Sequence, residues 1–367
     1  MKKFVVLILC CMLATGTFAH AEENVVRFTY ESAVETAVEN SIQPELDDYN
    51  IKAMESALEK AKEEAIKGFI GGTPQEVAER KIIKEVGPFE AEVNLEVAKR
   101  QKADNIRQIK ADVYQEMMKV LLAQESIEIK KKRIDLLEEK YQIDLQRFDE
   151  GLVSEAEITE QELALSVERL ELKNMETALA LNILNMKQKL HVDLSDDCRI
   201  EFDYKLQKIG TPYVLDIFDI ENAIIKAKEN NTLVYQKKMA LEAAEKKLEI
   251  TKQHLKPGHD FYEKKVYEFE KAKKDLYDAE TDLEVSIRNA YNELLTASDA
   301  LDLALRREEL ENSRFKTLEI KYNAGVISRR DMIDTELSLL ARRQATLEAI
   351  CDFNIKNDVL RNLIEFE

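Results

Sequence analysis

The chain has 367 residues and a formal net charge of −18 at pH 7, because 72 acidic residues outnumber 54 basic ones. Nucleic-acid binding needs a basic surface, so this excess of acid argues against that class of protein. Charged residues make up 34% of the chain and tryptophan is absent, a composition more typical of long-helix proteins than of compact globules.

Residues 1–21 have the layout of a secretory signal peptide. Lys2 and Lys3 precede an apolar run from Phe4 to Leu13, and Ala19-His20-Ala21 is a small-x-small cleavage site. An uncleaved membrane anchor is the alternative, but the run is shorter than the ~20 apolar residues that span a bilayer. We therefore expect an exported protein in which no transmembrane helix remains.

Two long stretches of the chain lack the residues that break helices. Phe89 to Thr211 contains no proline and only Gly151 and Gly210, and His259 to Glu367 contains no proline and only Gly325. Each stretch is long enough for two helices that reverse at the internal glycine. The sequence therefore predicts two long helical hairpins, the longer helices of roughly 60 residues reaching ~90 Å.

Apolar residues recur every seven positions within these stretches, a spacing that predicts left-handed coiled-coil packing. The rows are Ile106, Val113, Val120, Ile127, Ile134, Tyr141 and Phe148; Ile158, Leu165, Leu172, Leu179 and Met186; Leu276, Leu283, Ala290, Ala297 and Ala304, with Ile287, Leu294 and Leu301 beside them; and Met332, Leu339, Thr346, Phe353 and Leu360.

The two halves of the chain repeat one another. A shift of 174 residues places Gly151 on Gly325 and Ser154 on Ser328, and a shift of 190 places the phrase beginning at Ala33 on that beginning at Ala223. We expect residues 22–211 and 212–367 to form two helical repeats. Each would contain a starter helix, a second helix, a break, a very long helix, a tight turn and a return helix.

The two reversals share one turn chemistry. A glycine just past a helix end accepts the left-handed conformation that closes the helix, and the serine three residues later suits the N-cap of the next helix. An aliphatic pair lies between them in each turn, which suggests a contact surface. These pairs are Leu152-Val153 and Val326-Ile327.

The sequence carries few marks of catalysis or metal binding. No two histidines stand four residues apart, and CxxC, HExxH, GxSxG and phosphate-binding glycine patterns are missing. Cys198 and Cys351 remain after removal of the signal peptide, and no spacing pattern supports a disulfide between them. We expect no enzyme activity, no cofactor and no metal.

Together these features resemble the TolC family of outer-membrane efflux ducts. The resemblance depends on the aromatic-x-x-Gly-aliphatic-aliphatic-Ser turns and on the starter phrase Ala33-x-x-x-Ala37-x-x-Asn40, which returns as Ala223-x-x-x-Ala227-x-x-Asn230. Tyr114 and Tyr291 also occupy comparable places in the long helices. The resemblance implies a homotrimer whose twelve helices enclose a hollow cylinder.

The resemblance also assigns roles at the turns. It makes the residues of both turns the surface that docks a periplasmic adaptor of an inner-membrane pump, and these residues are Gly151, Leu152, Val153, Ser154, Gly325, Val326, Ile327 and Ser328. The family carries entrance acids six and nine positions after the second glycine, which correspond here to Asp331 and Asp334. Glu157 and Glu160 have the same offsets in the first half. Helix capping is the structural alternative for these four acids.

One departure concerns the segments between the second helix and the long helix of each half. The family inserts a β-hairpin there, and two transmembrane strands with their turns need about 30 residues. Gly68 to Pro88 is shorter and does not alternate, and Pro257-Gly258 is barely a turn. We expect an all-α protein of duplicated antiparallel hairpins, a TolC-like α-barrel protomer without a transmembrane β-barrel.

The favoured function is therefore a helical conduit of the cell envelope that receives small-molecule or protein cargo from an inner-membrane transporter. A structural coiled-coil spacer without a lumen is the main alternative, and a chaperone-like binder with long helices is a third. A conduit helix needs two apolar seams, one for each neighbour. The second long helix shows two such rows and the first shows one.

Overall fold

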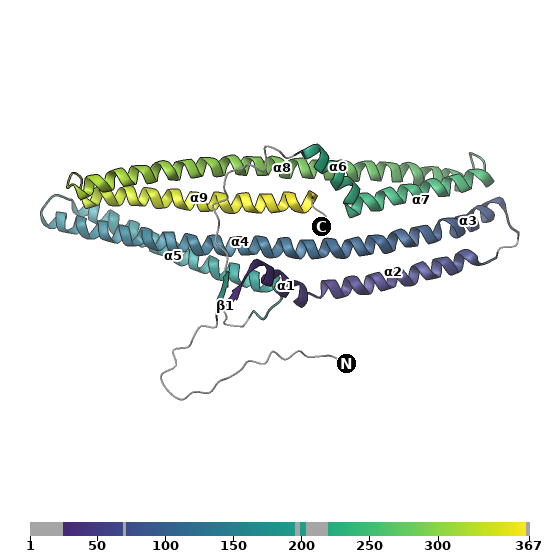
Figure 1. Cartoon of the computed structure of the whole chain (residues 1–367), viewed down its shortest axis with the longest axis horizontal. Helices are drawn as coiled ribbons and strands as arrows, with labels where there is room; N and C mark the ends of the chain where they lie inside the picture. Colours follow the sequence, from purple (N-terminus) through teal and green to yellow (C-terminus); the bar gives the residue numbers. More distant parts are fainter. Residues whose placement is uncertain (1–24, 69–70, 195–198, 203–218, 365–367) are drawn as a thin grey trace, which may run out of the picture.

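The computed structural model describes residues 25–68, 71–194, 199–202 and 219–364. The predicted signal peptide lies outside these residues. The described chain forms an elongated bundle in which most helices run along one long axis, and both hairpin reversals lie at the same end (Figure 1). The all-α fold of duplicated long hairpins is confirmed.

The helices have closely matched lengths in the two halves. The first half contains α1 (Tyr30–Asn40), α2 (Gln43–Ile66), α3 (Pro74–Glu85), α4 (Gly87–Asp149) and α5 (Glu155–Lys189). The second half contains α6 (Ile220–Asn230), α7 (Thr232–His254), α8 (Asp260–Asn323) and α9 (Arg329–Ile364). The long helices α4 and α8 have 63 and 64 residues, which corresponds to about 95 Å each.

The segments between the second and the long helix differ between the halves. In the first half, the 12-residue helix α3 begins after a capping box in which Thr73 accepts from the backbone N–H of Glu76. In the second half, α7 ends at His254 and α8 begins at Asp260 after a short turn around Gly258. The first half therefore has a short helix between Gly68 and Pro88 where the second half has a turn.

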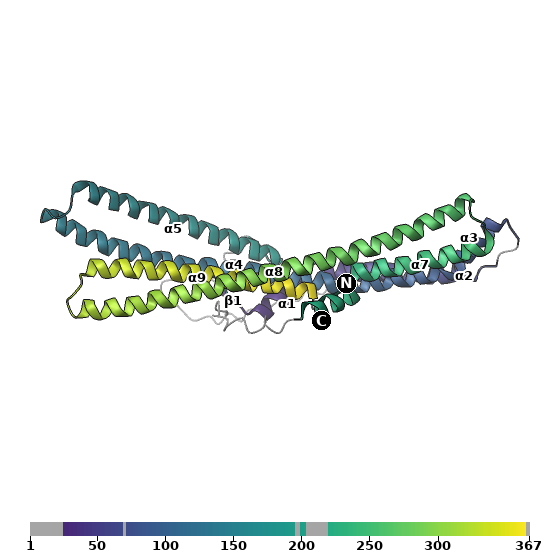
Figure 2. The same ribbon diagram turned by 90° about the horizontal axis from the view of Figure 1, so that it is seen from above.

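Four long helices lie side by side at the reversal end, in the order α5, α4, α9, α8 (Figure 2). The inner helices α4 and α9 pack against each other and against the outer helix of their own hairpin. At the opposite end, α2, α3 and α7 pack against α4 and α8. The two hairpins therefore meet along the α4–α9 seam, and α5 and α8 form the outer edges.

The heptad rows supply much of the buried core. In the second hairpin, buried side chains of α8 and α9 form one continuous cluster, against which α6 also packs. Its members include Ile224, Leu283, Ile287, Leu294, Leu301, Ile350, Phe353 and Leu360. In the first half, Val113 and Val120 of α4 pack with Met186 of α5 and with Ala33 and Ala37 of α1. A third cluster crosses the seam and contains Met117, Met118, Leu121 and Cys351.

A small parallel sheet was not predicted from the sequence. Strand β1 (Val25–Phe28) pairs in parallel with β2 (Arg199–Phe202), so that Phe28 lies opposite Phe202 with ring centroids 6.4 Å apart. Strands of four residues separated by most of a repeat leave no local pattern in the sequence. Their pairing depends on the folding of the helices between them.

Two further expectations concern cysteine and the membrane. Cys351 is a buried thiol with no disulfide partner among the described residues, its Sγ lies 3.7 Å from the carbonyl oxygen of Met118, and burial raises its pKa to about 11. Cys198 lies outside the described residues. No helix in the described part of the chain is both long and apolar enough to cross a bilayer.

Candidate functional site at the hairpin tips

Both reversals close their first helix with a glycine in the left-handed conformation. Gly151 has φ +76° and Gly325 has φ +72°. The N–H of Leu152 donates to the carbonyl of Arg147 at 2.8 Å, and the N–H of Val326 donates to that of Lys321 at 2.9 Å. These 6→1 bonds are those of a Schellman motif. Open space surrounds each glycine Cα, so glycine is needed for its backbone conformation and not for its small size.

The serines begin the return helices through capping boxes. The N–H of Glu157 donates to Ser154 Oγ at 3.3 Å, and Glu157 Oε2 accepts from the N–H of Ser154 at 2.9 Å. Ser328 and Asp331 make the equivalent pair at 3.2 Å in both directions. Hydrogen bonds from serine lower the pKa of both carboxyl groups, so Glu157 and Asp331 have capping roles whatever else they do.

The aliphatic pairs project one side chain each into solvent. Leu152 is 64% exposed and Val326 is 70% exposed, whereas Val153 and Ile327 are half-buried. The two tips therefore present an apolar contact at the same end of the bundle. The protomer itself leaves these two apolar side chains uncovered.

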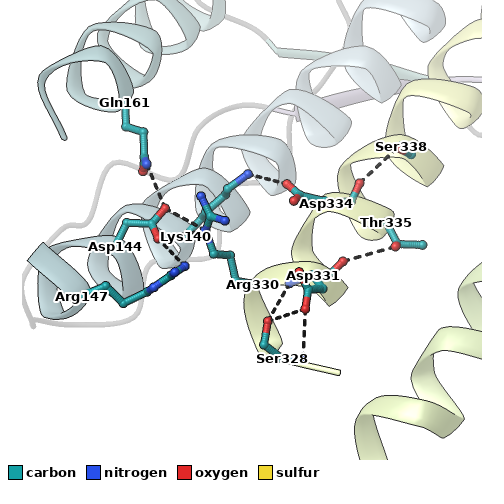
Figure 3. A network of polar contacts seen from close by, with 10 residues as sticks. All are labelled: Lys140, Asp144, Arg147, Gln161, Ser328, Arg330, Asp331, Asp334, Thr335 and Ser338. Atoms are coloured by element: carbon teal, nitrogen blue, oxygen red, sulfur yellow. Dashed lines mark hydrogen bonds and ion pairs between the residues drawn. The ribbon is translucent and has the colours of Figure 1, made fainter. Parts of the chain in front are cut away.

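The two remaining predicted acids differ in their surroundings. Asp334 is exposed and forms an ion pair across the hairpins with Lys140 of α4 (Figure 3). Glu160 is also exposed, and it has no polar partner among the described residues. The structure therefore brings Asp331 and Asp334 together on the first turns of α9, and it places Glu157 and Glu160 on the first turns of α5.

Asp144 is the functional candidate that the sequence analysis missed. Its side chain is fully buried, and Arg330 Nε lies 2.9 Å and 3.1 Å from its two carboxylate oxygens. Gln161 Nε2 donates to it at 2.8 Å from α5, and Arg147 lies 3.5 Å away (Figure 3). A buried carboxylate is stable only with such partners, so Asp144 joins α4, α5 and α9 at one point.

A second arginine strengthens the same junction. Arg329 donates to both carboxylate oxygens of Glu139 on α4, at 2.7 Å and 2.8 Å, and its third contact is Glu336 at 2.6 Å. The hydrogen bond from Arg329 lowers the pKa of Glu139. Bidentate arginine–carboxylate pairs restrain orientation as well as distance. The tip ends of the two hairpins are therefore held together by charge.

A sequence signal for this junction exists in the difference between the repeats. At the 174-residue shift, Arg329 and Arg330 replace Glu155 and Ala156. At the same shift, Asp144 stands where the second repeat has Leu318. A dibasic pair in one repeat and a lone acid on the seam of the other are complementary, but their proximity depends on how the hairpins pack.

Comparison with known proteins supports the fold and the resemblance. Residues 261–364, which cover α8 and α9, match the family model described as outer membrane efflux protein. No curated protein sequence matches the chain significantly. The sequence match therefore covers the second hairpin.

Solved structures extend the likeness to nearly the whole chain. The outer membrane protein VceC of Vibrio cholerae is similar with a TM-score of 0.69 and 10% identity, over 92% of this chain and 97% of that one. CusC is similar with a TM-score of 0.68 and 10% identity, over 95% of both chains. The outer-membrane channel OprN is similar with a TM-score of 0.66 and 12% identity, over 92% of this chain and 90% of that one. The resemblance to the TolC family is thereby confirmed, and the fold is that of these channels.

Proposed function

We propose that the protein is a TolC-like conduit component of the cell envelope, in which copies of the chain assemble side by side into a helical duct. The observation that carries this proposal is an unpartnered apolar row on each outer helix. The inner helices α4 and α9 have neighbours on both sides, whereas α5 and α8 have a long-helix neighbour on one side at the reversal end.

The row on α5 follows one face of the helix. Leu163, Val167 and Leu170 lie within two turns, and Leu181 and Leu184 continue the row after five helical turns. Their exposed fractions run from 41% to 66%. A charged sequence that keeps leucines on the solvent side of an edge helix is typical of a helix with a further neighbour.

The opposite edge carries a matching row. Val285, Leu303 and Leu310 of α8 are 50%, 48% and 71% exposed, and spacings of 18 and 7 residues keep them on one face. Packing α5 of one copy on α8 of the next would cover both rows. Such a head-to-tail contact forms a closed ring when the rotation between copies closes, and we propose three copies because the family resemblance implies a trimer.

Mass measurement and imaging test this assembly. We expect the purified chain to be a trimer by light scattering, with a central channel visible by electron microscopy. The double substitution Leu163→Asp with Leu170→Asp should give monomers because it places charge in the buried contact. Ala345→Asp is the matched control, since Ala345 is exposed on the inner helix α9. A wild-type monomer or dimer without a channel would favour the structural spacer.

The hairpin tips are proposed as the docking surface for a periplasmic adaptor of an inner-membrane pump. Exposure of Leu152 and Val326 at the same end supports this role. Substitution of both by aspartate should abolish binding of the adaptor from the same cell, measured by biolayer interferometry, and should leave the trimer intact. Adaptor binding by this variant at wild-type affinity would remove the tips from the docking surface.

The acids behind the tips are proposed to line the entrance. Three copies of Asp331, Asp334, Glu157 and Glu160 would give rings of negative charge that favour cations. Hydrogen bonds from Ser154 and Ser328 lower the pKa of Glu157 and of Asp331, and so favour the charged form of these two carboxyl groups, which supports the proposal. Charge reversal at Asp331 and Asp334 should change the ion selectivity of reconstituted trimers. An unchanged reversal potential would restrict both residues to the structural roles described above.

The division into repeats follows the same proposal. We propose that residues 22–211 and 212–367 arose as copies of one unit, each contributing one hairpin to the duct wall. The correspondence of α4 with α8 and of α5 with α9 supports this division, since each pair differs by one residue in length.

A further inference from the structure

A cavity of about 380 Å³ lies between the two hairpins, away from the tips. It opens among α4, α5 and α9, and its apolar lining includes Ile129, Met175 and Leu340. Along the seam it lies between the Lys140–Asp334 ion pair and the contact of Met118 with Cys351. This volume is in the range of pockets that hold small organic ligands.

One polar group in the cavity wall lacks a partner. Gln344 Nε2 donates to Ser126 Oγ and to Glu348 Oε1, both at 2.8 Å, whereas the buried Gln344 Oε1 accepts no hydrogen bond from any residue that the structure describes. The reverse amide orientation would place this carbonyl against the Glu348 carboxylate, so the orientation is determined by its neighbours. Buried acceptors are nearly always satisfied, and Gln344 Oε1, on a residue that lines the cavity, is therefore short of a hydrogen-bond donor.

The charges around the cavity point to a positive ligand. Lys130 and Arg133 line the α4 side, and both already bind Glu168 of α5, at 2.5 Å and 2.9 Å. Lys130 also binds Glu171 at 2.5 Å. Two cations are thus matched by two carboxylates, and the charge of Glu348 on the α9 side has no cationic partner among the described residues.

We propose that this cavity binds a small protonated amine with an apolar body. The apolar body would pack against Ile129, Met175 and Leu340, and the ammonium would donate to Gln344 Oε1 and to the Glu348 carboxylate. An ammonium has three donors and no acceptor, which suits two neighbouring acceptors. This site is formed within one chain and does not depend on the conduit role.

Three probes with the same ring test the chemical class. Calorimetric titration of the full chain with 2-phenylethylamine, 2-phenylethanol and 3-phenylpropionate separates the cationic, neutral and anionic head groups. We expect the amine to bind about tenfold or more tightly than the alcohol, because its hydrogen bonds to acceptors are charge-assisted. The acid should bind weakest. Equal or tighter binding of the acid or alcohol, or no binding of the amine at millimolar concentration, would overturn the proposal.

Substitutions locate the site. Glu348→Gln and Gln344→Met should each weaken amine binding by about tenfold, and Ala341→Phe should abolish it by filling the cavity from an exposed position. Glu176→Gln, on an exposed part of α5 outside the cavity lining, is the matched control and should bind as wild type. The Glu348 side is solvent-exposed, so that variant should fold even if Ala341→Phe does not. Unchanged affinity in Glu348→Gln would exclude this cavity.

Discussion

The two hairpins have almost the same length but are held together by different forces. In α9, 11 of 36 residues are buried, among them Met332, Leu339, Ile350, Phe353 and Leu360. In α5, only Leu165, Met186 and Lys187 of 35 residues are buried. The reason is position, because α9 lies between α8 and α4, whereas α5 has α4 on one side.

Charge takes a larger part in the first hairpin. Lys130 and Arg133 reach Glu168 across α4 and α5, and Arg169 reaches Glu138 at 2.6 Å. Partly exposed ion pairs each contribute little to stability, whereas a continuous apolar core contributes in proportion to its buried area. The comparison indicates that the second hairpin is stable within the protomer and that the first depends more on its neighbours.

The largest expected effect is in the second hairpin's core. Leu294→Ala removes a side chain that is 2% exposed and should lower the free energy of unfolding by about 2–5 kcal/mol. Leu170→Ala, at a position 59% exposed, should cost less than about 1 kcal/mol in the monomer. Denaturant titration of monomeric protein measures both. Equal costs would remove the distinction between the hairpins.

The next largest loss of stability is expected from substitutions at the junction between the hairpins, where Arg330 pairs with Asp144. Arg330→Ala leaves the buried Asp144 carboxylate with Gln161 and the more distant Arg147, so we expect a loss of about 2–3 kcal/mol. Arg147→Ala should cost less than about 1 kcal/mol because its contact is long and partly exposed. If the double variant Asp144→Leu with Arg330→Ala is as unstable as Arg330→Ala alone, the unpaired charge is not the cause.

Replacement of the turn glycine should destabilise the protein by the same amount at either turn, whereas the helices that the turns join differ in stability. Gly151→Ala and Gly325→Ala each force a Cβ into the left-handed conformation and should cost about 1–2 kcal/mol. Gly68→Ala is a suitable control because its φ is not positive and open space surrounds it. Thermal unfolding measures all three. A cost at one turn only would show that the reversals are not equivalent.

The smallest expected effect is a pH dependence of stability that arises from one half-buried carboxyl group of the second hairpin. Burial raises the pKa of Asp358 on α9 to about 6. A raised pKa in the folded state means that stability is greatest below the unfolded value near 4 and falls as pH rises through about 6. Asp358→Asn should therefore stabilise the protein by about 1 kcal/mol at pH 7, after allowance for partial exposure, and by less at pH 4. The same gain at both values would contradict this assignment.

The sequence predicted the local features well because each depends on nearby residues. The glycine reversals, the serine caps and the heptad rows follow from spacing within one or two helices, and α5 and α9 begin at the positions expected from Ser154 and Ser328. The β1–β2 pair and the Asp144–Arg330 contact join residues 174 and 186 positions apart. Such contacts depend on which faces meet, which one sequence does not reveal.

The candidate site was predicted only in part for the same reason. Glycine, serine and the exposed aliphatics could be located from the two turns alone. The ion pair of Asp334 with Lys140 depends on the approach of α9 to α4, and so does the Arg329–Glu139 pair. The residues that join the hairpins were therefore found only in the structure.

The parallel pairing of β1 with β2 has a consequence for the order of folding. Val25 pairs with Arg199, so the strands meet only after α1 to α5 have returned the chain to its starting point. Contacts of such long sequence separation form slowly because loop closure must precede them. We expect this pair to form late and its amide hydrogens to exchange faster with solvent than those of α8 and α9.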